Sequence, residues 1–100
     1  MKTIGFIRVS TLDQDTEKNK LDMLQFANSH KLGNVEFVEE KVSGTKDYRK
    51  RKLGTLLDSM NNGDVLIVPE LSRIARSTIQ ILEVIQITQD KGITLYSLKE

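Results

Sequence analysis

The sequence predicts an α/β fold, in which a mostly parallel sheet carries helices on both faces and the elements follow the order βαβαβαβ. Segments rich in Val, Ile and Leu alternate along the chain with segments whose apolar residues recur at helical spacing. The segment Val65–Val68 is apolar without a break, which is typical of a strand buried on both faces of a sheet. The connections between these segments are short.

The first half of the chain begins with a strand predicted at Thr3–Val9. A helix is predicted over residues 13–30, and turn-forming residues separate it from a second, shorter strand over residues 35–40. The apolar residues expected to face the core from this helix are Leu21, Leu24 and Ala27, flanked by Met23 and Phe26. Residues 41–50 show no apolar period and are predicted to form a loop.

A short amphipathic helix is predicted next, over residues 53–60, from the spacing of Leu53, Leu56, Leu57 and Met60. The strand Val65–Val68 follows, and Pro69 ends it because proline cannot donate a hydrogen bond to a neighbouring strand. Residues 70–76 are predicted to be irregular.

The last part of the chain is predicted to contain a third helix and a fourth strand. Ser77 and Gln80 fit a capping box at the start of the helix, and Gly92 suits its left-handed C-terminal cap. The residues expected to face the core from this helix are Ile79, Ile81, Leu82 and Ile85. Residues 93–98 form the predicted fourth strand.

Composition limits the classes of function. The chain has 100 residues, which suits one domain, and a net charge of only +1, which excludes polyanion binding by bulk charge alone. Basic residues nevertheless cluster between positions 46 and 52. The absence of cysteine excludes a disulfide framework and a thiolate metal site. Because no signal peptide and no apolar run of transmembrane length is present, we expect a cytoplasmic protein without a membrane partner.

Polar side chains with complementary chemistry follow two of the predicted strands. Arg8 and Ser10 stand at the end of the first strand, and Arg73 and Arg76 follow the third. Because the carboxyl ends of parallel strands meet at one edge of the sheet, where ligands bind in open α/β folds, we expect these residues to share one site. A hydroxyl nucleophile beside guanidinium groups suits a phosphoryl-transfer transition state, which positioned cations stabilise.

Simpler interpretations exist for the same residues. Ser10 fits a helix cap or a turn, and the arginines fit surface ion pairs, for instance with Glu70. The sequence lacks the residues that other mechanisms need. His30 is the only histidine, so no Ser-His-Asp arrangement is evident. No Gly-x-Gly-x-x-Gly nucleotide-binding loop follows the first strand, and the acidic residues form no tight metal-binding motif. We therefore expect neither a metal nor a cofactor.

Several motifs resemble those of the serine site-specific recombinases, the resolvase/invertase family, over nearly the whole chain. These motifs are Phe6-Ile7-Arg8-Val9-Ser10-Thr11 with Asp13-Gln14, Val42-Ser43-Gly44, the run from Gly63 to Val68, and the run from Leu71 to Ser77. The resemblance implies a resolvase-like catalytic domain in which Ser10 attacks a DNA phosphodiester, leaves a free 3′ hydroxyl and becomes joined to the 5′ phosphate. It implies that Arg8, Arg73 and Arg76 bind that phosphate, with Gln14 and Ser43 in support.

The resemblance also implies a further arginine after the Ser-Gly loop. Counting forward from Ser43 gives Arg49, and counting back from the following helix gives Arg51, which we favour because the helix register supports it. The chain departs from the family's usual pattern at Ser72, where an aspartate is usual, and at Ala75, where a glycine is usual.

The implied partners are double-stranded DNA and further copies of the full-length protein, which would form a dimer and then a synaptic tetramer. The resemblance implies that residues 1–100 are the catalytic domain of a longer chain, whose dimerisation helix and DNA-binding domain lie outside them. The main alternative is a non-enzymatic, receiver-like α/β interaction module. Such a module needs acidic residues at the edge where this chain carries Arg8, Ser10, Arg73 and Arg76, and a nucleotide-binding domain needs the absent glycine-rich loop.

Overall fold

A computed structural model describes residues 1–9, 16–41, 49 and 51–99 of the chain. The elements follow the predicted order, with a short 3₁₀ turn, η2, added after the third strand. Their bounds are β1 Thr3–Val9, α1 Thr16–Ser29, β2 Glu36–Lys41, α2 Lys52–Ser59, β3 Val65–Val68, η2 Leu71–Arg73, α3 Thr78–Lys91 and β4 Thr94–Ser97. The predicted bounds lie within one or two residues of the observed ones, except at the start of α1, which was predicted at residue 13, outside the described residues.

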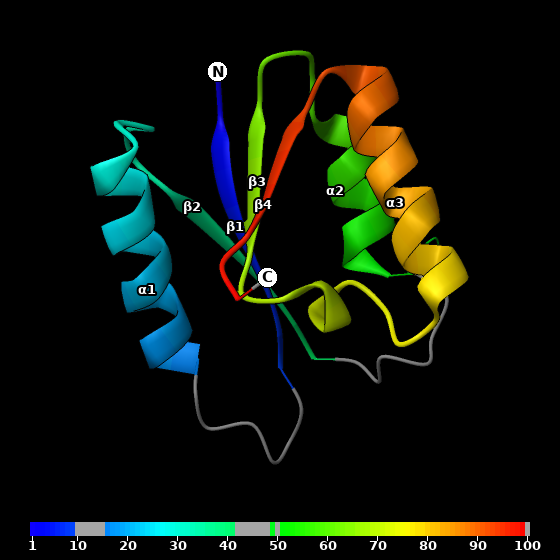
Figure 1. Cartoon of the computed structure of the whole chain (residues 1–100), viewed down its shortest axis with the longest axis horizontal. Helices are drawn as coiled ribbons and strands as arrows, with labels where there is room; N and C mark the ends of the chain where they lie inside the picture. The colour runs from blue at the N-terminus through cyan, green and yellow to red at the C-terminus, as the bar shows by residue number, and fades with distance from the viewer. Residues whose placement is uncertain (10–15, 42–48, 50, 100) are drawn as a thin grey trace.

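The four strands form one parallel sheet in the order β2-β1-β3-β4. Helix α1 covers one face of the sheet, and α2 and α3 cover the other (Figure 1). The chain runs from β1 to β2 on one side and then returns to β3 on the other side of β1. The strand order therefore reverses between β1 and β3, and in such folds the crevice outside the carboxyl ends of these two strands is the place where ligands bind.

The sheet separates two apolar layers. The layer under α2 and α3 consists of Ile4, Phe6, Leu53, Leu57, Met60, Leu66, Val68, Ile74, Ala75, Val84 and Ile93. The layer under α1 is smaller and consists of Ile7, Met23, Ala27, Val65 and Ile67. Strand β3 contributes to both layers, so the prediction that Val65–Val68 is buried on both faces is confirmed.

The predicted buried face of α1 is wrong in part. Leu21 and Leu24 are 55% and 46% exposed, whereas Met23 and Ala27 are buried in the core. The helix carries apolar residues on more than one side. The side that packs against the sheet is the one with Met23 and Ala27, which lie four residues apart and therefore on the same face. Phe26, expected to flank the core, packs partly against it.

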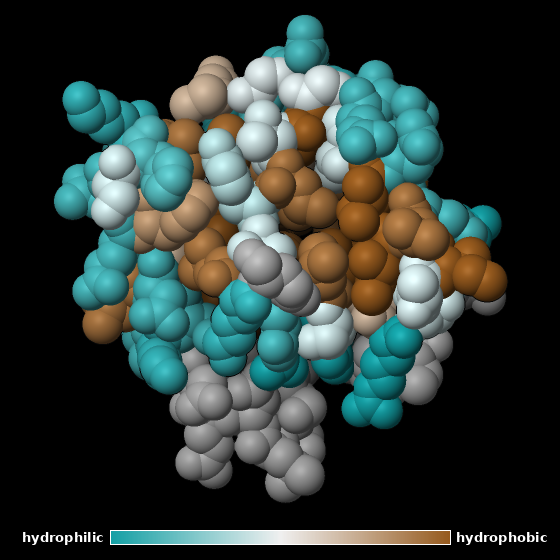
Figure 2. Space-filling model, in the orientation of Figure 1, coloured by the Kyte–Doolittle hydropathy of each residue, from teal (hydrophilic) through white to brown (hydrophobic). Residues whose placement is uncertain are grey.

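The predicted buried face of α3 is wrong at two positions for a similar reason. Ile79 and Leu82 are 69% and 59% exposed, while Val84 and Thr88 are buried. Thr88 tolerates burial because its hydroxyl donates to the Ile85 carbonyl, at 2.7 Å. Figure 2 accordingly shows apolar side chains gathered on the surface over β4 and the neighbouring side of α3.

The predicted ends of α3 are confirmed. The Ser77 hydroxyl accepts a hydrogen bond from the Gln80 N–H at the N-terminus, and Gly92 closes the helix with a φ of +73°. Within the described part of the chain, no helix is both long enough and apolar enough to cross a membrane.

Candidate active site

Three of the predicted site residues lie near the carboxyl ends of β1 and β3 or in the segment that follows β3. Arg8 is the penultimate residue of β1, Arg73 ends the turn η2 that follows β3, and Arg76 precedes α3. The carboxyl ends of these neighbouring strands and η2 lie at the same edge of the molecule (Figure 1). Three further predicted residues, Ser10, Gln14 and Ser43, lie outside the described residues. In sequence, Ser10 follows the last residue of β1 directly.

The three arginines differ in exposure. Arg8 is only 7% exposed and lies on the sheet face that α2 and α3 cover, in register with Glu40 of β2. The Arg73 side chain is 23% exposed, and its Nε lies 3.4 Å from the Glu70 carboxylate. Arg76 is exposed. The cations therefore range from the sheet interior to the surface.

The Arg73–Glu70 pair is the surface ion pair that the simpler interpretation expected. Both side chains are partly exposed, and pairs of this kind contribute only about 0–1 kcal/mol. A pair this weak does not by itself exclude phosphate binding by Arg73. Only Leu71–Arg73 forms a helical turn, so Arg73 and Arg76 do not share one continuous helix face.

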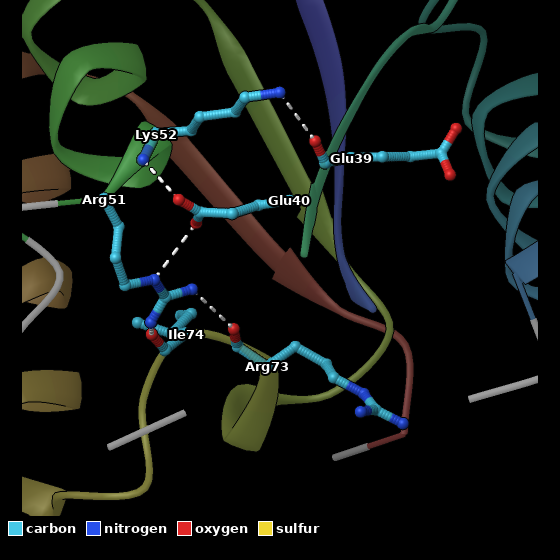
Figure 3. A network of polar contacts seen from close by, with 6 residues as sticks. All are labelled: Glu39, Glu40, Arg51, Lys52, Arg73 and Ile74. Carbon is cyan, nitrogen blue, oxygen red and sulfur yellow. Dashed lines mark hydrogen bonds and ion pairs between the residues drawn. The ribbon is translucent and has the colours of Figure 1, made fainter. Parts of the chain in front are cut away.

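A buried polar network lies behind this edge (Figure 3). The Arg51 side chain is 0% exposed, and its Nε donates to Glu40 Oε1 at 3.0 Å. Its Nη1 donates to the Ile74 carbonyl at 2.6 Å, and its Nη2 donates to the Arg73 carbonyl at 3.4 Å. The other Glu40 oxygen, Oε2, accepts the backbone N–H of Lys52 at the start of α2. The network thus joins the end of β2, the start of α2 and the segment that carries Arg73.

The two candidate loop arginines are placed differently. Arg51 is buried in this network, and its guanidinium lies over the Phe6 ring, 6.0 Å from the ring centroid. The Arg49 side chain is 62% exposed and pairs with Glu83 of α3 at 3.0 Å. Sequence reasoning did not find the role of Glu40, although Glu40 shares the strand parity of Val38, which packs against the core.

The described residues contain no group of three or more His, Cys, Asp or Glu side chains that could hold a metal ion. His30 is exposed at the end of α1 and stacks on Phe26 with a centroid distance of 4.0 Å. A separate pocket lies between α1 and the residues that follow β3 and β4. Its lining includes Asn19, Phe26 and Pro69 but none of the arginines discussed above.

Comparison with known proteins shows the family of the chain. The family model described as the N-terminal domain of resolvase matches residues 3–100. The chain is 39% identical to the Tn1546 transposon resolvase of Enterococcus faecium and 33% identical to the DNA-invertase hin of Salmonella typhimurium, and each match covers 100% of this chain. The chain spans about half the length of these curated relatives, 49% in both cases.

Solved structures show the same fold. A resolvase family site-specific recombinase from Streptococcus pneumoniae is 26% identical, with a TM-score of 0.70 over 99% of this chain and 72% of that one. A serine recombinase from Sulfolobus solfataricus is 20% identical, with a TM-score of 0.67 over 99% of this chain and 69% of that one, a likeness that concerns the fold alone.

The fold of this chain is therefore an α/β domain in which arginines lie at or after the carboxyl ends of two parallel strands. The chain belongs to the resolvase N-terminal domain family, as the match over residues 3–100 shows. The receiver-like alternative has no support, because the described edge carries Arg8, Arg73 and Arg76 where a receiver needs acidic residues.

Proposed function

We propose that this chain is the catalytic domain of a serine site-specific recombinase that cuts and rejoins double-stranded DNA. The Ser10 hydroxyl loses its proton as it attacks a DNA phosphodiester, and a bond forms between its Oγ and phosphorus. The bond from phosphorus to the 3′ oxygen breaks, and that oxygen leaves as a 3′ hydroxyl after it gains a proton. The protein is then joined to the 5′ phosphate. Attack by the 3′ hydroxyl of an exchanged strand reverses these steps and releases Ser10.

The observation that carries this proposal is the placement of three arginines at or after the carboxyl ends of two neighbouring strands, the first of which Ser10 follows in sequence. Arg8 lies one residue before the end of β1, and Arg73 and Arg76 follow β3, the strand beside it. Phosphoryl transfer develops negative charge on the phosphate oxygens, and fixed cations stabilise that charge. Guanidinium groups suit this role because their planar N–H donors match the geometry of a phosphate.

The remaining site residues and the partners complete the proposal. Gln14 and Ser43 support the reacting phosphate with polar contacts. In the full-length protein, segments outside residues 1–100 recognise the DNA and bring copies together, first as a dimer and then as a synaptic tetramer. The names of the relatives, which include resolvases and invertases, support an activity in DNA recombination.

The test is the formation of a covalent protein–DNA adduct by the full-length protein on its recombination site, with EDTA present. We expect the wild-type protein to form an adduct that maps to Ser10 and the Ser10→Ala variant to form none. Ser29→Ala, which changes an exposed serine at the end of α1, serves as the matched control and should keep the adduct. An adduct that persists in Ser10→Ala would place the nucleophile elsewhere.

A further inference from the structure

We propose that Arg51 is a positioning residue, which fixes the backbone of Arg73 and does not itself bind the DNA phosphate. This inference rests on the proposed recombinase function and adds a role for one of its arginines. The first observation is burial. The Arg51 side chain is 0% exposed, whereas the Arg73 side chain is 23% exposed and Arg76 is exposed.

The second observation is the direction of the Arg51 donors. Each of its three guanidinium nitrogens donates to the protein: Nε to the Glu40 carboxylate, Nη1 to the Ile74 carbonyl and Nη2 to the Arg73 carbonyl. These bonds use three of the five guanidinium N–H donors, and the side chain is 0% exposed, so a phosphate contact would have to draw the guanidinium out of this network. It would also remove the buried Glu40 from its cationic partner, and a buried charge without a partner is strongly destabilising.

The third observation is that the two carbonyls bound by Arg51, those of Arg73 and Ile74, lie at the end of the turn η2. Arg73 and Ile74 end the short turn η2, whose own hydrogen bonds run from the Arg73 N–H to Glu70 and from the Ile74 N–H to Leu71. A turn this short leaves its last carbonyls without partners inside the turn, and Arg51 supplies partners for two of them. Ile74 and Ala75 are 0% exposed and anchor the same segment in the core.

The hydrogen bonds from Arg51 fix the backbone from which the Arg73 side chain extends. Figure 3 shows the Arg73 side chain extending away from the Arg51–Glu40 pair, while its carbonyl faces Arg51. Arg51 thus holds the backbone at Arg73 through its carbonyl, while the Arg73 guanidinium lies beside the Glu70 carboxylate. A misplacement of about 1 Å in a catalytic group can cost about 100-fold in rate, so a fixed backbone here has a functional consequence.

The main experiment uses Arg51→Lys in the full-length protein. Lysine keeps the charge beside Glu40 but lacks the planar fork that reaches both carbonyls. Without DNA, we expect amide hydrogen exchange at Arg73 and Ile74 to rise about 10-fold relative to wild type, because the turn opens locally more often. The rate of adduct formation should fall about 10- to 100-fold, while the dissociation constant for DNA should change less than about 2-fold, since no phosphate contact is lost.

A double-mutant cycle with Arg73→Ala separates positioning from direct contact. If Arg51 acts through Arg73, Arg51→Lys should slow adduct formation little further once Arg73 is alanine. Rate losses that multiply in the double variant would overturn the proposal, because they indicate an independent contact with the phosphate. Unchanged exchange at Arg73 and Ile74 in Arg51→Lys would also overturn it. Thr55→Ala, at an exposed position on α2, is the control and should change neither measurement.

A second variant guards against simple loss of folding. Glu40→Leu combined with Arg51→Met replaces the buried ion pair by apolar side chains, a change that is often neutral for stability. We expect this variant to fold but to show the same fast exchange and slow adduct formation as Arg51→Lys, and wild-type rates would overturn the proposal. If the wild-type protein forms no adduct, the proposed recombinase function fails, and the exchange measurement alone still decides whether Arg51 fixes this turn.

Discussion

Glu40 and Arg51 form a buried ion pair, with 3.0 Å between Glu40 Oε1 and Arg51 Nε and side-chain exposures of 8% and 0%. Glu40 also lies in register with Arg8 on the neighbouring strand β1. One carboxylate therefore lies beside an arginine of the candidate site and binds the arginine that holds the Arg73 backbone. The shape of the arginine edge depends on this carboxylate as well as on the cations themselves.

Replacement of Glu40 by alanine should be strongly destabilising. It leaves the buried Arg51 charge without its partner and removes the acceptor of the Lys52 N–H. Loss of one member of a buried pair costs about 3–5 kcal/mol, which urea denaturation at neutral pH measures directly. Glu39→Ala is the matched control, because Glu39 is 43% exposed and pairs with Lys20 at the surface. It should cost less than about 1 kcal/mol. Equal losses for the two variants would contradict this account.

A close approach between β1 and α1 gives a second prediction. A Cβ atom at Gly5 would lie 2.8 Å from Met23 Sδ and 3.0 Å from Phe37 Cδ1, both closer than ordinary van der Waals contact. Met23 is 0% exposed and has little room to move. Gly5→Ala should therefore cost about 1–3 kcal/mol through overpacking, as measured by urea denaturation.

A double variant tests the cause of that loss. Met23→Ala alone should destabilise the fold by about 2–5 kcal/mol, because it opens a cavity. When Gly5→Ala and Met23→Ala are combined, the added methyl group occupies part of that cavity. The combined loss should then be smaller than the sum of the single losses, by about 0.5 kcal/mol or more. Strictly additive losses would show that Met23 is not the group that the new methyl meets.

The sequence was sufficient to predict the order and the approximate bounds of the helices and strands. Val65–Val68 is uniformly apolar and could only be a buried strand in this context, and the cap at Ser77 and the stop at Gly92 have local causes. These signals act within a few residues, so they are readable without the tertiary structure. The strand order was not readable in the same way, because it depends on which strands pair across long separations.

The faces of the helices depended on information that the sequence lacks. Helix α3 carries isoleucine, leucine and valine around much of its circumference, so its spacing alone does not select Val84 over Leu82. Likewise, Glu40 and Arg51 are eleven residues apart and read as surface charges in isolation. Their burial follows from the packing of α2 against the end of β2, a contact that no local pattern encodes.

Asp64 gives a prediction about pH. Its carboxylate accepts the backbone N–H groups of Asn61 and Lys2, each at 2.9 Å, and these hydrogen bonds lower the pKa of Asp64 below its ordinary value of 3.8. A carboxyl whose pKa is lower in the folded state stabilises the fold above the unfolded pKa of about 3.9, and this contribution is lost as the pH falls through the folded pKa.

Asp64→Asn should consequently cost about 1–3 kcal/mol at pH 7, since the asparagine keeps one acceptor but no charge. The difference in unfolding free energy between wild type and variant should shrink as the pH falls below about 4, because the Asp64 carboxyl of the unfolded chain takes up a proton there, and the charge-dependent part is lost as the pH falls through the folded pKa. Urea denaturation at pH 7 and pH 3 measures both values. Asp58→Asn, at an exposed position on α2, should change stability by less than about 0.5 kcal/mol at either pH. A gap that widens in acid would reverse the sign of the proposed linkage.

Substitution of Arg76 can test an effect on activity with little effect on the free energy of unfolding, because Arg76 is exposed whereas Arg8 and Arg51 are buried. Arg76→Gln should change the free energy of unfolding by less than about 0.5 kcal/mol. If its guanidinium stabilises the transition state, the rate of adduct formation by the full-length protein should fall about 100- to 1000-fold. Arg76→Lys should recover only part of that loss, because an ammonium keeps the charge without the planar pair of donors.

The matched control for Arg76 is Lys31→Gln, which removes an exposed positive charge in the turn after α1. It changes the net charge by the same amount as Arg76→Gln, so equal losses of activity in the two variants would point to general attraction for DNA rather than to a specific contact. Raising the salt concentration distinguishes the two effects further. A general electrostatic contribution weakens as salt increases, whereas the ratio of wild-type to Arg76→Gln rates at saturating DNA should stay nearly constant if Arg76 contacts the reacting phosphate.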